Sequence, residues 1–287
     1  MRYNDEWKDY EIIATGGGEK LERWGDVVLL RPDPQVIWRA EKPLDKYPKI
    51  DAKYSRSFNG GGAWQFFKPL SEWTVSWRNL RFKVKPMGFK HTGLFPEQAA
   101  NWSIMMELIK NANRPISVLN LFAYTGAATV ACTYAGATVT HVDSAKNMVE
   151  RAKQNMEING LSSKPVRYIV DDCAKFINRE IKRGNFYDAI IMDPPSYGRG
   201  PNGELWKIEN NIFDFLMLCT KVLSEKPLFV FLNSYTTGLQ PTVLSNLLTL
   251  SVAKKAKGRV VSYEICLPTC QNIFLPCGAS GLFIGEN

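Results

Sequence analysis

The regular alternation of strand and helix patterns after residue 116 constrains the fold more than any other feature. Strand patterns cover residues 117–122, 137–142, 166–170, 187–192, 228–232 and 259–266, with a last one near 282–284. Helical patterns lie between most of them, at residues 127–134, 145–159, 174–183, 205–223 and 241–255. Strands separated by helices form right-handed βαβ units with a parallel sheet covered on both faces. We therefore predict an α/β fold with a doubly wound, mostly parallel, Rossmann-like sheet, whose last two strands form an antiparallel edge.

The first 90 residues follow a different pattern of short strands and turns. Strand patterns there cover residues 26–31, 35–40, 64–67, 73–77 and 80–85, and the first helical pattern begins only at residue 97. We therefore predict a small β-rich domain over residues 1–90 and an α/β domain over residues 91–287.

Composition is that of a globular protein, with 45% hydrophobic and 22% charged residues. No apolar run approaches the roughly 18 residues that a membrane span needs, and the charged N-terminus lacks the apolar segment of a secretory signal. We expect a cytoplasmic protein with no membrane association. Cys266, Cys270 and Cys277 lack the paired spacing of zinc ligands, and both histidines lie far away in sequence, so we expect reduced thiols and no metal site.

The net charge of +8 is concentrated in residues 49–90. This window holds nine Lys or Arg against Asp51 and Glu72, and aromatic residues are interleaved with the cations. Cations that neutralise phosphates, beside rings that stack on bases, are the two ingredients of single-strand nucleic-acid binding. A small domain also needs aromatic rings for its core, so each ring could either pack in the core or stack on a base. The charge excess favours nucleic acid, RNA first, as the partner of this window.

The first strand of the alternating region ends in a turn with one glycine. Asn120, Phe122, Tyr124 and Thr125 precede Gly126, which permits a tight turn and close approach of a ligand to the backbone. The turn lacks the G-x-G-x-x-G pattern, which disfavours a dinucleotide with a pyrophosphate.

Acidic residues follow the next strands. Asp143 stands where a carboxylate accepts hydrogen bonds from ribose hydroxyls, and Asp171-Asp172 stand where one accepts from an adenine amino group. Such residues also cap helices, and that alternative is open for each acid taken alone. Their recurrence at successive strand ends favours an adenosine site.

The segment Asp193-Pro194-Pro195-Ser196-Tyr197 is the sharpest motif. Its prolines stiffen the loop and remove two backbone donors. Asp193 and the Pro194 carbonyl could accept from an exocyclic amine, and Tyr197 could stack on the base that carries it. The alternative is a rigid turn after a strand.

The segments NLFAYTGAAT, VDSAKNMVERAKQNMEING, DDCAKFI and IIMDPPSYGRG, in this order, resemble class I S-adenosylmethionine-dependent methyltransferases. The similarity covers about residues 80–285 and is greatest to the bacterial large-subunit ribosomal RNA (cytosine-C5) methyltransferase family. It implies S-adenosylmethionine as cofactor. The cofactor contacts that it implies come from Thr92, Phe95, Gln98, Asn120, Phe122, Tyr124, Thr125, Gly126, Asp143, Ser144, Asp172 and Cys173.

Two departures from this family concern the methyl acceptor. Cytosine-C5 transfer needs a thiolate, yet residues 232–237 contain no Cys, and Ser196 replaces the family's lysine. Cys277 is the alternative nucleophile, although free Cys is usually inert. The sequence thus predicts a methyltransferase acting on RNA of the ribosomal class, with Asp193, Pro194 and Tyr197 at the acceptor. A cofactor-binding protein without catalysis, a methyltransferase acting on a protein or small molecule, and a dinucleotide-dependent oxidoreductase are the alternatives.

Overall fold

The computed structural model describes residues 1–57, 61–199 and 205–286. The chain divides into two compact units. The larger consists of Met1, Asn101–Ile265 and Gly278–Asn287, and the smaller of Arg2–Ala100 and Cys266–Cys277. No helix of the described residues is long and apolar enough to cross a membrane.

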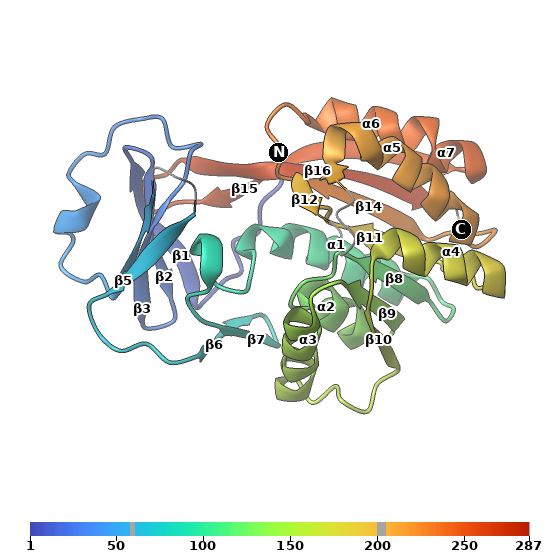
Figure 1. The fold of residues 1–287 in the computed structure, drawn as a ribbon, viewed down its shortest axis with the longest axis horizontal. Coiled ribbons are helices and arrows are strands. Elements are labelled where there is room, and N and C mark those ends of the chain that lie inside the picture. Colours follow the sequence, from blue (N-terminus) through green and yellow to red (C-terminus); the bar gives the residue numbers. More distant parts are fainter. Residues whose placement is uncertain (58–60, 200–204, 287) are drawn as a thin grey trace. The chain divides into compact units, whose positions relative to one another are not determined.

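The larger unit is built on a seven-stranded sheet in the order β10-β9-β8-β11-β14-β16-β15. The five strands β8 to β11 and β14 are parallel, and β16 pairs antiparallel with β14. These strands are β8 (Ser117–Leu121), β9 (Thr138–Asp143), β10 (Val166–Val170), β11 (Ala189–Met192), β14 (Phe229–Ser234), β15 (Gly258–Pro268) and β16 (Phe274–Gly285). The predicted doubly wound, mostly parallel sheet is confirmed (Figure 1).

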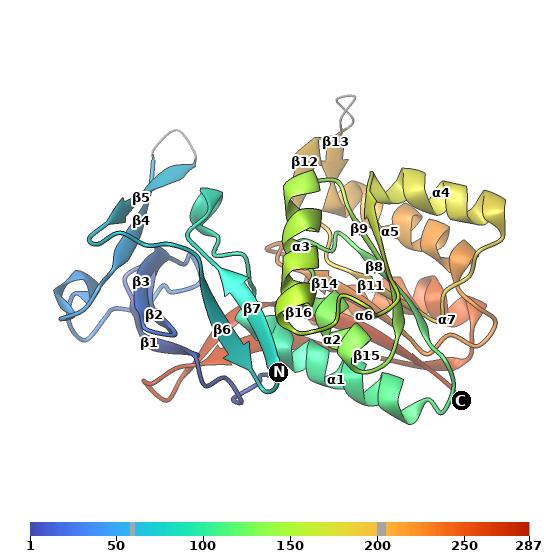
Figure 2. The ribbon, with the colours of Figure 1, turned by 90° about the horizontal axis from the view of Figure 1, so that it is seen from below.

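Helices cover both faces of this sheet (Figure 2). They are α1 (Ala99–Asn111), α2 (Ala127–Tyr134), α3 (Lys146–Ile158), α4 (Cys173–Arg183), α5 (Ile208–Cys219), α6 (Pro241–Leu250) and α7 (Val252–Lys255). Side chains alternate between the faces of a strand. Leu119 and Leu121 of β8 pack in one core with residues of α4, α5 and α6. Asn120, between them, bonds Thr129 of α2 on the other face.

Local sequence explains where these helices begin and end. The Asp172 carboxylate accepts from the Lys175 backbone N–H at the start of α4, at 2.9 Å. Gly184 ends the same helix with a left-handed φ of 68°. Helix α6 begins with Pro241 at its first position, where a missing N–H costs nothing.

The smaller unit holds a five-stranded sheet in the order β1-β2-β3-β4-β5 and a separate hairpin β6-β7. The strands are β1 (Tyr10–Gly16), β2 (Glu19–Trp24), β3 (Val27–Pro32), β4 (Ala52–Arg56), β5 (Gly62–Phe66), β6 (Trp73–Trp77) and β7 (Leu80–Val84). Three further turns of 3-10 helix are Leu44–Lys46, Gly88–Lys90 and Pro96–Gln98. The predicted β-rich N-terminal part is confirmed, although β1, β2 and β4 were not expected from the sequence.

Three predicted elements were wrong in detail. Residues 35–40 form no strand, because their backbone makes isolated bonds, such as the one from the Gly18 N–H to the Val36 carbonyl. The helix expected over 205–223 begins only at Ile208, since Leu205–Lys207 form β13, which pairs with β12 (Tyr197–Arg199). The helix expected over 241–255 breaks at Ser251, whose φ is −116° and ψ −80°.

The sequence places a domain boundary at residue 90. Residues 91–100 and 266–277 belong to the smaller unit by their contacts. Whether residues 1–90 form a domain that folds by itself stays a prediction.

Candidate functional site

The order of the sheet marks one position where a ligand is expected. The chain runs outward from β8 through β9 to β10 and then returns to the other side of β8 with β11. Open α/β sheets bind ligands beside the carboxyl ends of the strands at such a switch point. Most of the sequence-predicted residues follow the ends of β8, β9, β10 and β11, and these ends form the rim of the candidate site.

The turn after β8 is strained. Phe122, Tyr124 and Gly126 all have left-handed φ angles, of 54°, 51° and 79°. Only glycine adopts this conformation without steric cost. The Ala123 N–H donates to the Val142 carbonyl at 3.1 Å and the Asn155 amide to the Thr125 carbonyl at 2.9 Å, so neighbouring elements hold the turn in place.

Gly126 also packs too closely for any side chain. A Cβ at this position would lie 2.7 Å from the Cβ of Ala152 and 3.4 Å from the ring of His141. The glycine therefore sets both the turn and the approach of α3 to it.

Asp143 joins the first two strand ends. One carboxylate oxygen accepts from the Tyr124 N–H at 2.8 Å, and the other accepts from the Ala145 N–H at 2.9 Å. Burial raises the pKa of Asp143, against the opposing effect of these two donors. Each oxygen has a second lone pair for a ligand hydroxyl. Ser144, beside it, is exposed.

Cys173 is buried at the first position of α4. Burial raises the pKa of its thiol, and so do the charges of Asp143, Asp172 and Asp171. The Phe122 backbone makes a hydrogen bond with the same thiol. The structure thus brings the predicted residues of three strand ends together, and the thiol is protonated at neutral pH.

The two acids after β10 have structural partners. Asp172 caps α4, as the alternative interpretation of this residue expected. Asp171 forms an ion pair with Arg179 and accepts from the Asp172 N–H at 2.9 Å. Capping occupies one oxygen of Asp172, and within the described part of the chain no partner is recorded for the other.

The Asp193–Tyr197 loop is held at several points. The Trp206 indole N–H donates to the Pro195 carbonyl at 2.6 Å, and the hydroxyls of Ser196 and Thr236 lie 2.6 Å apart. No donor among the described residues is recorded for the Pro194 carbonyl. Asp193 is half-buried, Pro194 is buried, and Tyr197 is 54% exposed at the start of β12.

Sequence reasoning missed Trp206. Its ring lies 5.8 Å from the ring of Phe122 and 5.8 Å from that of Phe215, and Phe122 and Phe215 are 5.5 Å apart. This cluster connects the turn after β8 with the Asp193–Tyr197 loop. The only signal in the sequence was a tryptophan in a polar stretch just after the motif.

The predicted residue Asn120 belongs to a buried row of hydrogen-bonded side chains, whose other members, Thr129 and His141, were missed. The Asn120 amide donates to the Thr129 hydroxyl at 3.0 Å. The same hydroxyl oxygen lies 2.9 Å from Nδ1 of His141. Burial lowers the pKa of His141 to about 3, so its ring is neutral. Its Nε2 is buried with no partner among the described residues.

Three predicted cofactor residues belong to the smaller unit. Thr92 is buried, with its hydroxyl 3.5 Å from the Leu94 carbonyl, and Gln98 ends the turn that Phe95 precedes. The ring of Phe95 lies 5.6 Å from that of His91. The grouping of these three with the rim of the larger unit stays a prediction.

Cys277 lacks the properties of a nucleophile. Burial raises the pKa of its thiol well above the usual value, and the Glu97 carboxylate adds to the rise. The thiol donates to the Leu275 carbonyl at 3.5 Å. The side chain is half-buried, and a protonated thiol is a poor nucleophile.

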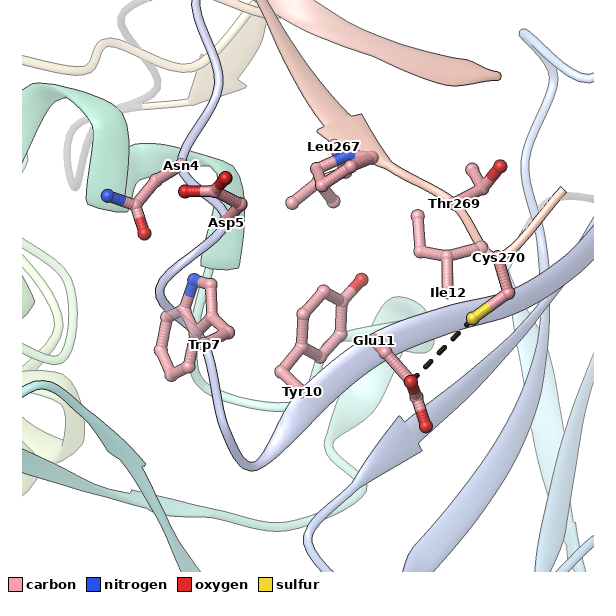
Figure 3. A pocket seen from close by; sticks show the side chains of 10 residues that line it. Asn4, Asp5, Trp7, Tyr10, Glu11, Ile12, Leu267, Thr269 and Cys270 are labelled. Atoms are coloured by element: carbon pink, nitrogen blue, oxygen red, sulfur yellow. Dashed lines mark hydrogen bonds between the residues drawn. The ribbon is translucent and has the colours of Figure 1, made fainter. Parts of the chain in front are cut away.

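The smaller unit also contains a cavity of about 250 Å³ that holds none of the predicted site residues. Figure 3 shows the rings of Trp7 and Tyr10, 6.0 Å apart, with Asp5 and Glu11 at the same cavity. Glu11 accepts from the Cys270 thiol at 3.6 Å. Two carboxylates make this cavity unsuitable for a phosphate.

Comparisons with known proteins concern the family and the fold. Residues 30–208 match the model of a family described as S-adenosylmethionine-dependent methyltransferases. A crystal structure of the SAM-dependent methyltransferase from Agrobacterium tumefaciens is 33% identical, covers 99% of this chain and 92% of its own, and superposes with a TM-score of 0.91. A methyltransferase solved with SAH, 20% identical over 98% of this chain and 76% of its own, has the same fold at a TM-score of 0.70.

Among curated proteins, the chain resembles ribosomal RNA large subunit methyltransferase K/L. That of Shewanella oneidensis is 31% identical over 248 residues, which are 80% of this chain and 32% of the relative. That of Shewanella frigidimarina is 31% identical over 156 residues, 54% of this chain and 21% of the relative. The chain thus spans between a fifth and a third of the length of these relatives.

Proposed function

The chain belongs to the family of S-adenosylmethionine-dependent methyltransferases, and we propose that it methylates RNA of the ribosomal class at an exocyclic amine, with Asp193, Pro194 and Tyr197 at the acceptor. The observation that carries the proposal is the rim of the larger sheet. Polar residues from four successive strand ends lie there, and for the Pro194 carbonyl no donor is recorded within residues 1–57, 61–199 and 205–286.

The residues at the ends of β8, β9 and β10 fit an adenosyl group. Asp143, fixed by two backbone donors, would direct its remaining lone pairs to the ribose hydroxyls. The unoccupied oxygen of Asp172 would accept from the adenine amine, with Ser144 and Cys173 beside these two acids. Asn120, Tyr124, Thr125 and the Gly126 turn would contact the rest of the cofactor. When bound, S-adenosylmethionine supplies an electrophilic methyl group on its sulfonium.

The positions of the cysteines support an amine as the acceptor. Carbon methylation of cytosine needs a thiolate that adds to the ring. Residues 232–237 contain no Cys, and the raised pKa of the half-buried Cys277 thiol keeps it protonated. An amine nitrogen needs no such nucleophile. Asp193 and the Pro194 carbonyl would accept hydrogen bonds from its two N–H groups, orienting the nitrogen lone pair, and Tyr197 would stack on the base. As the N–C bond forms and the methyl group leaves the sulfonium sulfur, the nitrogen would lose one proton to the Asp193 carboxylate or to water.

RNA as the substrate is supported by the basic window and by the names of the curated relatives. Residues 58–60 of this window lie outside the described residues. Its cations include Arg81, exposed on β7, and Lys83, which pairs with Glu72 at 3.3 Å. A cytoplasmic location stays a prediction.

The substitution Asp193→Ala tests the proposal. It should reduce methyl transfer to bulk ribosomal RNA by at least about 100-fold, the contribution of a well-placed polar group. Binding of S-adenosylhomocysteine should change less than about 3-fold, because Asp193 serves the acceptor. Radiolabelled methyl transfer and calorimetry measure the two quantities.

Asp214→Ala is the matched control, since Asp214 is an exposed aspartate on α5. It should leave both quantities unchanged. Full transfer by Asp193→Ala would remove the proposed role. Wild-type transfer to a protein or small-molecule pool, or to none, in place of RNA would reject RNA as the substrate.

A further inference from the structure

The structure separates the rings of the basic window into two groups. Tyr54, Trp77 and Phe82 are buried and belong to the core of the smaller unit. Phe66 and Phe67, by contrast, are 50% and 55% exposed. Burying a phenylalanine is worth about 1.5–3 kcal/mol, so two adjacent exposed rings are a candidate interaction surface.

Phe66 lies at the edge of the sheet. Strand β5 is the outermost in the order β1-β2-β3-β4-β5 (Figure 2). Phe66 is opposite Ala52, Trp64 is opposite Tyr54, and residues two apart share a face of a strand. The ring centroids of Trp64 and Phe66 are 6.3 Å apart with planes inclined by 28°, a stacked arrangement.

The base of this ring row is fixed. The Trp64 indole N–H donates to the Met87 carbonyl at 2.7 Å. The ring of Tyr54 meets Trp64 edge-on at 5.4 Å. The row therefore runs from buried Tyr54 through half-buried Trp64 to exposed Phe66, which is positioned before any ligand arrives. Preorganised rings lose little conformational entropy on binding.

Cations flank both ends of the row. Arg56 is opposite Gly62 and so shares the face of Trp64 and Phe66. It is exposed, and no ion pair is recorded for it within the described ranges. Lys68 follows the two phenylalanines, is 46% exposed, and pairs with Asp51 at 2.8 Å. A shallow hollow lies beside the rings, lined by residues 66–70.

We propose that Phe66, backed by Trp64, and Phe67, which lines the same hollow, form with Arg56 and Lys68 a base-stacking platform for a single-stranded segment of RNA. The inference rests on the proposed function and names the element that holds the substrate outside the acceptor loop. Unpaired bases offer free ring faces, whereas the bases of a duplex are stacked on each other. The platform therefore selects single strands and tolerates different sequences.

The test uses the full-length protein and a single-stranded RNA of about 12 nucleotides. Stacking on one ring is worth about 1–3 kcal/mol per base, so the double variant Phe66→Ala/Phe67→Ala should weaken binding at least about 10-fold. The slope of log affinity against log salt concentration should be the same for this variant as for the wild type, because no charge is removed. Arg56→Gln should instead reduce that slope by about 0.7, the value for one phosphate contact on a single strand.

Phe186→Ala is the matched control. Phe186 is 59% exposed, like the platform rings, but belongs to the larger unit. Its substitution should leave RNA binding unchanged. Phe66→Tyr retains a ring and should keep binding near the wild-type value, which separates stacking from a change in local structure.

The outcomes distinguish the platform from the proposed function. Unchanged RNA binding in the double variant, or equal affinity of the wild type for a duplex of the same length, would overturn the platform. Methyl transfer to RNA by the wild type, with its loss in Asp193→Ala, would then leave the proposed function standing. Failure of the wild type to methylate RNA at all would reject the proposed function instead.

Discussion

At the scale of single residues, backbone strain is concentrated in the turn after β8. Phe122 and Tyr124 have left-handed φ angles, which cost about 1–3 kcal/mol each for non-glycine residues. Asn155, Val142 and the Asp143 carboxylate hold this turn through hydrogen bonds. Strain that neighbouring elements maintain is typical of functional sites, and here it coincides with the switch point of the sheet.

Gly126→Ala should disturb this turn through two separate effects. The left-handed φ of 79° disfavours any side chain, and the new Cβ would lie 2.7 Å from that of Ala152. We expect the free energy of unfolding to fall by about 2–4 kcal/mol. Binding of S-adenosylhomocysteine should weaken at least about 10-fold, since α3 and the turn must separate. Urea denaturation and calorimetry measure the two effects.

Gly184→Ala is the control that isolates the φ effect. Gly184 has a left-handed φ of 68°, but a Cβ at this position would meet nothing within 4 Å among the described residues. Its substitution should cost only about 1 kcal/mol of stability and leave ligand binding intact. Equal losses in the two variants would contradict the role of close packing at Gly126.

The sequence could place Asp143, Asp172 and Asp193 at strand ends, because a strand followed by a helix fixes where such residues fall. It could not identify the hydrogen-bonded row of side chains that links Asn120, Thr129 and His141. That row depends on the pairing register of β8 and β9, which sets Asn120 opposite His141. The register between two strands is a property of the folded sheet, and the spacing of residues along the sequence does not reveal it.

At the scale of elements, the strands of the central parallel sheet were predictable, whereas the short pairings outside it were not. All four residues of β11 are buried, as expected for a central parallel strand. Residues 35–40 contain the apolar run Val36–Trp38, yet Ile37 is 90% exposed and the segment pairs with no strand among the described residues. Strand β13, by contrast, forms because it pairs with β12 next to the Asp193–Tyr197 loop. Such local pairing places Trp206 at the site without any periodic pattern.

The pairing of β2 with β3 encloses a charged network in the smaller unit. The Glu22 carboxylate, fully buried, accepts from Arg31 at 2.6 and 2.8 Å and from the Tyr10 hydroxyl at 2.7 Å. Burial alone would raise the pKa of Glu22, but the charges of Arg31 and Lys20 and these hydrogen bonds lower it to about 2. The network thus stabilises the ionised form of Glu22.

Glu22→Gln should lower the free energy of unfolding by about 3–5 kcal/mol at pH 7, because Arg31 is left buried without its counter-charge. A carboxyl group whose pKa is lowered by folding stabilises the folded state at pH values above its unfolded pKa of 4.5. This contribution disappears as the pH falls toward the folded pKa of about 2. The stability difference between wild type and variant should therefore shrink between pH 5 and pH 2. Urea denaturation over this pH range measures it.

Glu11→Gln serves as the comparison for this network. Glu11 pairs with Arg23 at 2.6 Å, but its side chain is 43% exposed. Solvent screening limits such a pair to about 1 kcal/mol or less. If the difference in the free energy of unfolding between the wild type and Glu22→Gln did not change with pH, the stability of the network would not depend on the ionised carboxylate.

At the scale of the whole molecule, the distribution of charge carries the argument for RNA. The cations of the 49–90 window are spread over β4, the segment after β5, and the hairpin β6-β7. On β7, Leu80, Phe82 and Val84 are buried, so Arg81 and Lys83 lie on the opposite face, and Lys85 follows the strand. The hairpin thus separates its apolar core from a cationic face.

Replacing Arg81, Lys83 and Lys85 together by Gln should weaken RNA binding by reducing the electrostatic part alone. If each cation meets one phosphate, the slope of log affinity against log salt should become shallower by about 2. Lys83 also pairs with Glu72, so its contribution to the change in slope should be the smallest of the three.

The matched control replaces Lys221, Lys254 and Lys255, three exposed lysines of the larger unit, by Gln. Both variants lose three charges, so the change of the protein's net charge is the same. A shallower slope in the first variant and not in the second would assign the contact to the hairpin, whereas equal slopes would mean that net charge alone attracts the RNA.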